Sequence, residues 1–237
     1  MLAKQYIIKQ QLEAMIGSGR LQIGERLPSE LLMAKEFGVS RETFRAAVRM
    51  LEEEGKLLVK HGVGTFVLRP LPTIPSSLEK LSSVGSMIRT AQLDEGESSV
   101  SVRIEGCSEE AAKALGIRPE DPVVVVERIR TANGEPVAFS INTIAKAWVG
   151  DAFEQEEFRG SLLNFFENRL GRKITTADSE ICVPLHIDRN CQRLLLYPHT
   201  TVLLLKQLHY DEANQPVLYS LDYLRNDVFS FHIRRTI

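Results

Sequence analysis

The stretch that decides the fold is Val39-Ser40-Arg41-Glu42-Thr43-Phe44-Arg45, which stands near the N-terminus. Ser40 is suited to begin a helix, because its hydroxyl can accept a hydrogen bond from a free amide of the first turn. Apolar residues then recur at i, i+3, i+4 and i+7, which is the spacing of one helix face. These residues are Phe44, Ala47, Val48 and Leu51. The stretch therefore predicts an amphipathic helix that starts after Ser40.

The same helix carries a second, basic face. Arg41, Arg45 and Arg49 recur at i, i+4 and i+8, a stripe turned away from the apolar residues. The planar fork of arginine can bond the O6 and N7 edge of guanine or a phosphate. A helix with these two faces can pack on a small core and enter a major groove of DNA. The alternative is an ordinary amphipathic helix whose charged face is solvated.

Two further helices are predicted before this one. Residues 5–16 form the first, and glycines interrupt the chain after it. Ser29 is expected to cap a second helix that runs to Phe37, and Gly38 ends it before Ser40 starts the third. The apolar face of the first helix consists of Ile8, Leu12, Met15 and Ile16.

A short hairpin is predicted after the three helices. Residues 57–60 and 65–68 have the pattern of two strands, and the turn between them is His61-Gly62-Val63-Gly64. Its glycines stand where the backbone must bend or come close to a partner. Taken alone, the hairpin is better explained as a plain β-turn. In this order, however, helices and hairpin predict a winged helix-turn-helix whose wing reaches the minor groove or the phosphates.

Residues 5–68 resemble the DNA-binding domain of the GntR family of bacterial transcription regulators. The matching residues are Gly24, Leu27, Pro28, Ser29, Glu30, Val39, Ser40, Arg41, Thr43, Arg45, Leu51, Gly55, Gly62, Gly64, Thr65, Phe66 and Val67. The resemblance implies base and phosphate contacts by Ser40, Arg41, Thr43 and Arg45 on the third helix and by His61 and Gly62 on the wing. Gly64 completes the expected wing, and charge and spacing add Arg26 and Arg49 to the expected DNA-binding residues.

Charge is divided unequally along the 237 residues, although the whole chain has a net charge of −2. Residues 1–69 hold 11 Lys and Arg against 8 Asp and Glu, a net charge of +3. The rest holds 18 against 23, a net charge of −5. This division is expected of a DNA reader joined to a part that does not bind DNA. Because +3 is modest, useful affinity for double-stranded operator DNA is expected to need two copies on one site.

Composition predicts a globular protein of the cytoplasm. Hydrophobic residues make up 43% and charged residues 25%, as in ordinary globular chains. The chain has no apolar run of about 18 residues that would suggest a membrane span, and its first residues do not resemble a signal peptide. The three cysteines, Cys107, Cys182 and Cys191, form no C-x-x-C pair, which suits a reducing compartment. We expect no membrane partner.

Proline marks the expected boundary between two domains. Pro70, Pro72 and Pro75 lie within six residues and precede two serines, a composition typical of an extended linker. We therefore expect a DNA-binding domain over residues 1–69, a linker over 70–77, and a second domain over 78–237.

The second domain is expected to mix helices with an antiparallel sheet, which gives the whole chain an α+β fold. Helices are predicted at residues 109–115 and 161–170. Strands are predicted at residues 100–104, 123–130, 137–144, 173–182, 202–210 and 217–224.

An internal repeat runs through this domain. Residues 115–130 align with residues 194–209 at an offset of 79, and residues 136–142 align with residues 216–222 at an offset of 80. Each copy reads as helix, strand, turn and strand. We infer two equivalent halves that pair into one antiparallel sheet, with a cleft where they meet. The alternative is that any two β-hairpins look alike.

The second domain resembles the effector-binding UTRA domain of the HutC branch of the same family, whose fold is like that of chorismate lyase. The resemblance spans roughly residues 80–235 and implies a small-molecule pocket and a homodimer formed largely through this domain. The matching residues are Ala112, Leu115, Glu127, Arg128, Ile129, Arg130, Gly134, Pro136, Val137, Ser161, Leu162, Pro216, Val217, Tyr223, Arg225, Asp227 and Phe229.

Arg128 and Arg130 share one face of a strand, because side chains alternate along it. Two adjacent guanidinium groups repel each other unless they share an anion, such as a phosphate or carboxylate of the ligand. Salt bridges to nearby carboxylates explain the pair equally well. The effector is thus expected to be a small molecule, with an anionic group as one of the two interpretations.

The resemblance adds five residues to this pair. In sugar-phosphate-binding relatives, residues that match Ser161 and Tyr223 line the pocket beside the arginines. Ser140 lies on the facing strand, and Ser83 and Ser86 belong to a segment that closes over the ligand in relatives. Leu163 replaces a polar or aromatic contact of such relatives, so a sugar phosphate does not follow from the sequence.

Two other classes of function compete with an effector-controlled repressor. A chorismate-lyase-like enzyme is not expected, because no nucleophile and base stand at motif spacing and the arginine helix would then be redundant. His186 and Cys191 lie near one another but lack further metal-ligand spacing, so neither a metal nor a cofactor is expected. The third class is a dimeric DNA-binding protein whose second domain binds no ligand.

Overall fold

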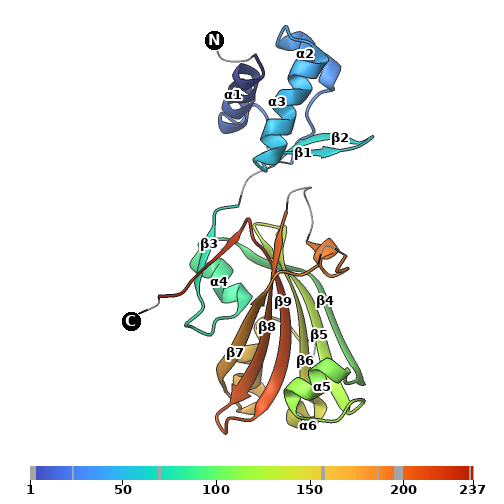
Figure 1. Ribbon diagram of the computed structural model, residues 1–237, viewed down its shortest axis with the longest axis vertical. Coiled ribbons are helices and arrows are strands. Elements are labelled where there is room, and N and C mark those ends of the chain that lie inside the picture. The colour runs from blue at the N-terminus through green and yellow to red at the C-terminus, as the bar shows by residue number, and fades with distance from the viewer. Residues whose placement is uncertain are drawn as a thin grey trace. The chain divides into compact units, whose positions relative to one another are not determined.

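The chain divides into two compact units, Met1–Leu71 and Pro72–Ile237 (Figure 1). The structure, a computed structural model, describes residues 4–22, 24–68, 71–155, 158–185, 187–194, 200–234 and 236. Each unit has its own hydrophobic core. Within the described residues, no helix is long and apolar enough to cross a membrane.

The first unit consists of helices followed by a hairpin, in the predicted order. The helices are α1 (Lys4–Gly17), α2 (Glu30–Glu36) and α3 (Arg41–Glu53). The strands β1 (Leu57–Lys60) and β2 (Gly64–Val67) pair antiparallel, and β2 begins one residue earlier than expected. The prediction of a winged helix-turn-helix is therefore confirmed.

The serine caps fix where α2 and α3 begin. The hydroxyl of Ser29 accepts a hydrogen bond from the amide of Leu32, and that of Ser40 accepts one from the amide of Thr43. The predicted apolar face of α3 is buried to 1% exposure or less. It packs in one core with Ile8 and Leu12 of α1. Burial of this face leaves the arginine face of α3 outward.

The second unit is built on a six-stranded antiparallel sheet in the order β4-β5-β6-β9-β8-β7. Its strands are β4 (Glu95–Gly106), β5 (Pro122–Ala132), β6 (Glu135–Ala145), β7 (Ile174–Cys182), β8 (Val202–Asp211) and β9 (Pro216–Arg225). Its helices are α4 (Val84–Thr90), α5 (Glu109–Leu115), α6 (Lys146–Val149), α7 (Ala152–Gln155) and α8 (Leu162–Phe165), with a π-helical turn η1 (Phe166–Leu170) and a 3-10 turn η2 (Cys191–Arg193). The helix predicted at residues 161–170 is thus divided between α8 and η1.

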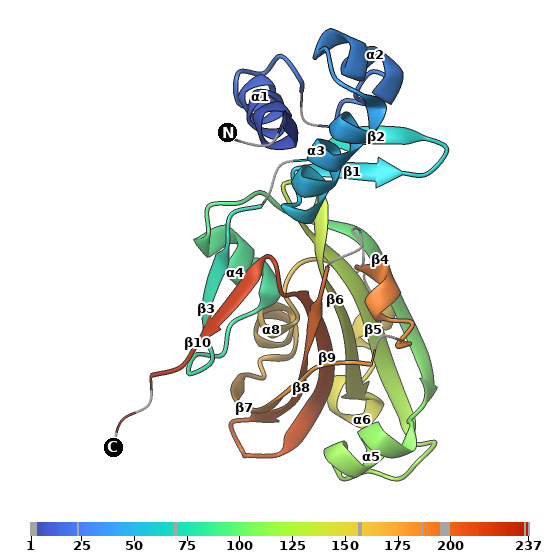
Figure 2. The same cartoon turned by 45° about the horizontal axis from the view of Figure 1, so that its top comes forward.

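Part of the expected linker is a strand. Strand β3 (Ile74–Ser77) pairs parallel with β10 (Phe229–His232), near the end of the chain (Figure 2). Ile74 is fully buried, whereas Pro75 is exposed, and proline is tolerated in a two-stranded edge position. The second half of the predicted linker at residues 70–77 therefore belongs to the second unit. Pro70 lies outside the described residues.

The internal repeat corresponds to a two-fold relation within the sheet. Ile141 of β6 pairs with Leu221 of β9, and these two residues are repeat equivalents. Each half contributes three adjacent strands, so the halves meet at the β6–β9 pair. The register also shifts at equivalent positions, after Arg130 in one half and after His209 in the other. Residues 195–199 of the second copy lie outside the described residues.

Alternation along the strands gives the sheet two different faces. On one face Val124, Val126 and Ile144 pack with Phe158 and Phe166 of the α6–η1 region. The opposite face packs against α5 in one cluster and against η2 in another. The first face also carries the polar side chains described below.

We predict that Phe166→Ala destabilises the second unit by about 3–5 kcal/mol, because it removes a large buried side chain and leaves a cavity in the core. Phe166 is fully buried, and its ring stacks edge-on against Trp148 at 4.9 Å between centroids. Trp148 is the one tryptophan of the chain, so urea unfolding followed by its fluorescence reports on this unit. Phe44→Ala, in the first unit, should leave that transition in place. An unchanged midpoint for Phe166→Ala would contradict the packing.

Candidate DNA-binding surface and ligand cavity

The arginine face of α3 is tied to the start of α2. Arg45 donates to both carboxylate oxygens of Glu30, at 2.8 and 3.4 Å, and Arg41 lies 3.7 Å from the same carboxylate. The bond from Arg45 is the main cause that lowers the pKa of Glu30. The Arg41 and Arg45 side chains remain 57% and 37% exposed. Glu30 therefore orients both guanidinium groups without removing them from the surface.

The expected contacts at the N-terminus of α3 are hydroxyl groups. Ser40 and Thr43 hydrogen-bond to each other at 2.8 Å, and the same Ser40 oxygen caps the helix. The first turn of a helix leaves free amides and a partial positive charge, which favour a phosphate. Ser40, Thr43 and Arg41 are thus placed together at an end of α3 that suits a DNA backbone.

The wing is an exposed turn with two glycines in positive-φ conformations. His61 and Gly62 are exposed, and φ is +74° at Gly62 and +142° at Gly64. The side chain of Arg26 crosses directly over Gly64, where a Cβ would collide with its Nε. Residue Arg26 also bridges to Phe66 of β2. Arg26 is therefore held at the base of the wing, and Gly64 is the residue that lets it lie there.

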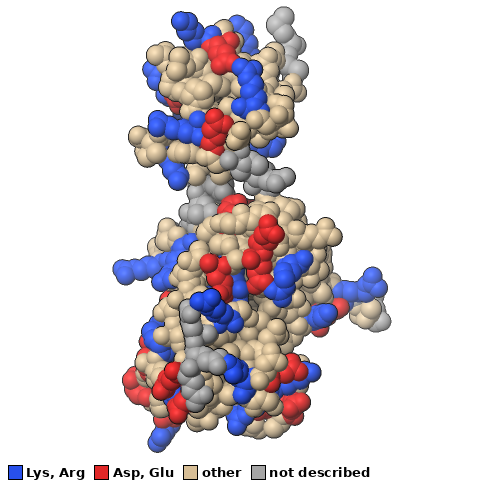
Figure 3. Space-filling model, turned by 180° about the vertical axis from the view of Figure 1, so that it is seen from behind, with Lys and Arg blue, Asp and Glu red and all other residues tan. Residues whose placement is uncertain are grey.

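The charged side chains also differ between the units. Figure 3 shows Lys and Arg standing out on the first unit, and both signs intermixed on the second. Arg49 is exposed on α3, as its spacing predicts. The nine expected DNA-binding residues thus all lie on α3, on the wing or at its base; their contacts with DNA stay a prediction.

We predict that Gly64→Ala loosens the wing, because alanine is strained at this φ and its methyl group collides with Arg26. A strain of about 1–3 kcal/mol corresponds to roughly 5- to 150-fold faster local opening. Hydrogen exchange of amides in residues 57–67, measured on the full chain, tests this. Gly17→Ala is the matched control, since φ there is not positive and nothing lies within 4 Å of the added Cβ. Equal exchange in both variants would show that Arg26 does not depend on Gly64.

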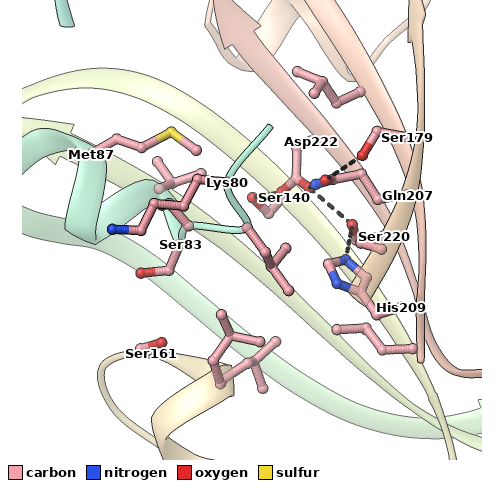
Figure 4. Close-up of a pocket in the computed structure, with 18 of the residues that line it drawn as sticks. Lys80, Ser83, Met87, Ser140, Ser161, Ser179, Gln207, His209, Ser220 and Asp222 are labelled. Atoms are coloured by element: carbon pink, nitrogen blue, oxygen red, sulfur yellow. Dashed lines mark hydrogen bonds between the residues drawn. The ribbon is translucent and has the colours of Figure 1, made fainter. Parts of the chain in front are cut away.

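The second unit encloses a cavity of about 270 Å³ on the polar face of the sheet (Figure 4). Strands β5 to β9 supply its floor, and the segment from Ser77 to Met87 and the start of α8 supply the other walls. This volume suits a metabolite-sized molecule. Its polar lining includes Lys80, Ser83, Arg128, Arg130, Ser140, Asn142, Ser161, Ser179, Gln207, His209, Ser220 and Asp222.

Five of the seven expected effector-binding residues line the cavity, namely Ser83, Arg128, Arg130, Ser140 and Ser161. Leu163, the departure from the sugar-phosphate pattern, lines it too. Ser86 does not: its amide donates to Ser83 Oγ at the start of α4.

Tyr223 corrects the sequence prediction, because alternation along β9 turns it to the opposite face of the sheet. There its ring stacks on Phe139, and its hydroxyl donates to Asp188 at 2.9 Å. Tyr223 therefore supports the far side of the β6–β9 pair and does not line the cavity.

The two arginines are neutralised inside the protein. Arg130 Nη1 lies 2.8 Å from Glu95 and 2.9 Å from Glu97, and Arg128 lies 3.6 Å from Glu97. Both guanidinium groups also donate to the carbonyl of Gly160, at 2.6 and 2.5 Å. Burial and the charge of Arg130 lower the pKa of Arg128 to about 10. Of the two interpretations left open by the sequence, the structure contains the salt bridges.

Sequence reasoning missed the polar group from the other half of the sheet. Asp222 accepts from Ser140 at 2.5 Å, from Gln207 at 2.9 Å and from Ser220 at 2.9 Å. His209 Nε2 lies 3.2 Å from the Ser220 hydroxyl. The internal repeat carried the signal, since Gln207 and His209 are the equivalents of Arg128 and Arg130.

The hydrogen bonds around Ser220 determine the tautomer of His209. The single hydroxyl proton of Ser220 goes to the Asp222 carboxylate, so His209 must donate through Nε2. In the neutral ring Nδ1 is then a bare acceptor, and it is buried with no hydrogen-bond partner among the described residues. Burial lowers the pKa of His209 to about 4, so the ring is neutral near pH 7.

This order of groups is not that of an acyl-transfer site. A serine nucleophile needs its hydroxyl bonded to the imidazole that takes its proton, whereas the hydroxyl of Ser220 donates to a carboxylate. The described residues contain no group of three or more His, Cys, Asp and Glu side chains that could hold a metal ion. His186, which stands near Cys191 in the sequence, lies outside the described residues.

Fold and site together define a two-unit transcription regulator, in which a winged helix-turn-helix is joined to a domain with a small-molecule cavity. Residues 5–67 match the family model "Bacterial regulatory proteins, gntR family", and residues 95–230 match that of the UTRA domain. The chain therefore belongs to the GntR family, in the group whose second domain is a UTRA domain. The resemblance drawn from the sequence is confirmed.

Named relatives cover nearly the whole chain. The HTH-type transcriptional repressor NagR of Bacillus subtilis is 27% identical over 226 residues, 95% of this chain and 92% of NagR. The probable transcriptional regulator PhnF of Escherichia coli is 27% identical over 210 residues, 88% of this chain and 86% of PhnF. The crystal structure of PhnF from Mycobacterium smegmatis has a TM-score of 0.61 at 24% identity, and the match covers 97% of this chain and 100% of that one. NagR and the Escherichia coli PhnF are named as transcriptional regulators and not as enzymes.

We predict that lowering the pH destabilises the protein, because His209 is held neutral in the folded state. The unfolded imidazole takes up a proton near its ordinary pKa of 6.5, while the folded ring stays neutral until about pH 4. The free energy of unfolding therefore decreases as the pH is lowered through this window, by about 3 kcal/mol in all. Urea unfolding followed by Trp148 fluorescence at pH 7 and pH 4.5 measures the loss.

Two variants separate His209 from the acidic groups that also titrate. His209→Gln should lose less stability than the wild type between these pH values. His232→Gln, at an exposed position near the end of β10, should behave as the wild type. An equal pH dependence in all three proteins would contradict the burial of a neutral His209.

Proposed function

We propose that the chain is a transcriptional repressor that binds a palindromic operator as a homodimer and is controlled by a small-molecule effector. The arginine face of α3, exposed and held by Glu30, is the observation that carries the proposal. The repressor role is supported by the relative NagR, which is named a repressor. As a bacterial DNA-binding regulator, it would act in the cytoplasm with its operator.

Two exposed sheet edges favour a second copy of the chain as partner. β4 and β7 end the six-stranded sheet, and each leaves one side without a strand among the described residues. Exposed apolar side chains follow both edges: Val100, Val102 and Ile104 on β4, and Ile181, Val183, Leu185 and Ile187 on and after β7. Unpaired edges of this kind pair readily with another chain. Because a net charge of +3 gives one DNA-binding domain only modest affinity, two copies would be needed on one operator. A dimer would place one α3 helix on each half-site.

The cavity favours an effector over a ligand-independent dimer. A domain that only dimerises has no need of a 270 Å³ cavity lined by buried polar groups. An anionic effector would compete with Glu95 and Glu97 for Arg130. The geometry therefore does not favour an anionic group at Arg130. Regulation further requires that the effector bind the two operator-binding states with different affinity.

We predict that Arg41→Ala weakens binding to the operator by about 1–3 kcal/mol, or roughly 5- to 150-fold, because a direct contact is lost. Fluorescence anisotropy with the promoter DNA of the protein's own operon measures the affinity. Arg20→Ala is the matched control, since Arg20 is exposed and pairs with Glu36 outside α3. If both variants bound as tightly as the wild type, α3 would not be the recognition helix.

A further inference from the structure

We propose that the half of the cavity formed by β8 and β9 is a subsite for a hydrogen-bond donor of the effector. The acceptors are Nδ1 of His209 and Oδ1 of Asp222. This inference rests on the proposed function of the cavity and adds the chemical class of its ligand. The ligand is a small molecule that presents a hydroxyl or an amine to these two atoms.

The two-fold relation of the sheet places equivalent residues on the two sides of the cavity floor. Arg128, Arg130, Ser140 and Asn142 of one half correspond to Gln207, His209, Ser220 and Asp222 of the other, and all eight line the cavity. The pairing is reciprocal, since Ser140 lies opposite Asp222 and Asn142 lies opposite Ser220. A floor with symmetric positions thus carries cations on one side and acceptors on the other, so its two halves offer a ligand different groups.

Arg130 is already paired by the protein. Its guanidinium group donates to Glu95 and to the carbonyl of Gly160, and Glu97 lies 2.9 Å from it. A ligand group that approached Arg130 would compete with two carboxylates within 2.9 Å. Arg128 differs, because its Nε has no hydrogen-bond partner among the described residues. An added anion therefore gains little at Arg130.

Asp222 retains capacity to accept one more hydrogen bond. Each carboxylate oxygen offers about two acceptor positions. Within the part of the chain that the structure describes, Oδ2 accepts from Gln207 and Ser220, whereas Oδ1 accepts only from Ser140. Asp222 is 8% exposed, so a donor that reaches Oδ1 forms a charge-assisted bond away from bulk water.

His209 supplies the second acceptor. Its Nδ1 is buried and has no hydrogen-bond partner in the described ranges, and in Figure 4 it lies on the side of the ring away from Ser220, toward the interior of the cavity. A buried acceptor without a donor costs free energy that a ligand donor recovers. Because the ring is tied to Asp222 through Ser220, both acceptors belong to one rigid network. Leu205 and Leu218, the strand partners of Asp222 and His209, line the same wall.

The first step of the test needs no ligand. Nitrogen NMR of the full chain labelled with ¹⁵N-histidine, with the signals of His209 assigned by their loss in His209→Gln, reports which ring nitrogen carries the proton. The proposal requires a proton on Nε2 and none on Nδ1 at pH 7. A protonated Nδ1 would overturn it.

Three probes of one six-carbon skeleton then test the class of ligand: sorbitol, glucamine and gluconate, each at up to 100 mM. We expect sorbitol or glucamine to shift the Nδ1 signal, and gluconate to shift it less than either. A larger response to sorbitol would assign the donor as a hydroxyl, and a larger response to glucamine would assign it as an amine. An Nδ1 signal that moves most with gluconate, or with none of the three, would overturn the proposal.

Variants locate the response. Asp222→Asn should weaken binding of the responding probe at least about 10-fold, since it replaces a charged acceptor by a neutral amide. His232→Gln, outside the cavity lining, should bind as the wild type. Equal affinities in all three proteins would overturn the role of Asp222, with circular dichroism used to check that Asp222→Asn is folded.

Operator binding, measured with the same probe, separates this proposal from the proposed function. A probe that shifts the Nδ1 signal of His209 without changing operator affinity would support the subsite and overturn effector control by that ligand class. A probe could instead release the operator without shifting the Nδ1 signal, and with equal effect on the wild type and Asp222→Asn. That result would support effector control and overturn the subsite.

Discussion

The antiparallel pairing of β6 with β9 is the constraint on which the cavity depends. Its register, centred on Ile141 and Leu221, brings Ser140 opposite Asp222. A slip of one residue would turn every polar side chain of one strand to the opposite face. The buried Phe139 and Tyr223, which stack across the same pair on the far face, oppose such a slip. The stacking of Phe139 on Tyr223 on the far face of the sheet thus stabilises the register on which the hydrogen bonds of the cavity face depend.

Buried charge sets the second constraint. Arg128 and Arg130 are 8% and 5% exposed, and a buried guanidinium group without partners would be strongly destabilising. The partners come from two places far apart in the sequence, β4 and the carbonyl of Gly160. Neutralising the arginines therefore also fixes where the chain enters α8. The position of the cavity wall at the start of α8 therefore depends on the pairing of these arginines as well as on apolar packing.

Local signals in the sequence predicted local structure closely. Ser40 marks the start of α3 because a cap depends only on the next three residues, and the α3 core face follows from its helical spacing. The pairing of β3 with β10 was missed, because it joins residues about 150 positions apart and β3 contains a proline. The carboxylate partners of Arg130 were not identified because Glu95 and Glu97 lie in the part of β4 that precedes residue 100, where the predicted strand began.

The error at Tyr223 has a different origin. Alternation tells which residues of one strand share a face, but the choice of face depends on the register with the neighbouring strand. The repeat held that information, because Ser140 corresponds to Ser220 and so places Ser220, Asp222 and Leu224 on the cavity side. A resemblance to relatives transferred Tyr223 to the site, whereas the symmetry of this chain excludes it.

The carboxylate of Glu95 connects the cavity floor to the wall formed by α4, which follows the DNA-binding unit along the chain. Glu95 pairs with Arg130 of β5 and also with Arg89 of α4. Gly85 of α4 lies so close to Glu95 that a Cβ would collide with it. The wall formed by α4 follows β3, which begins at Ile74, shortly after the first unit ends at Leu71. Glu95 and α4 therefore join the cavity floor to the segment of chain that follows the DNA-binding unit, and this connection does not involve the β6–β9 pairing.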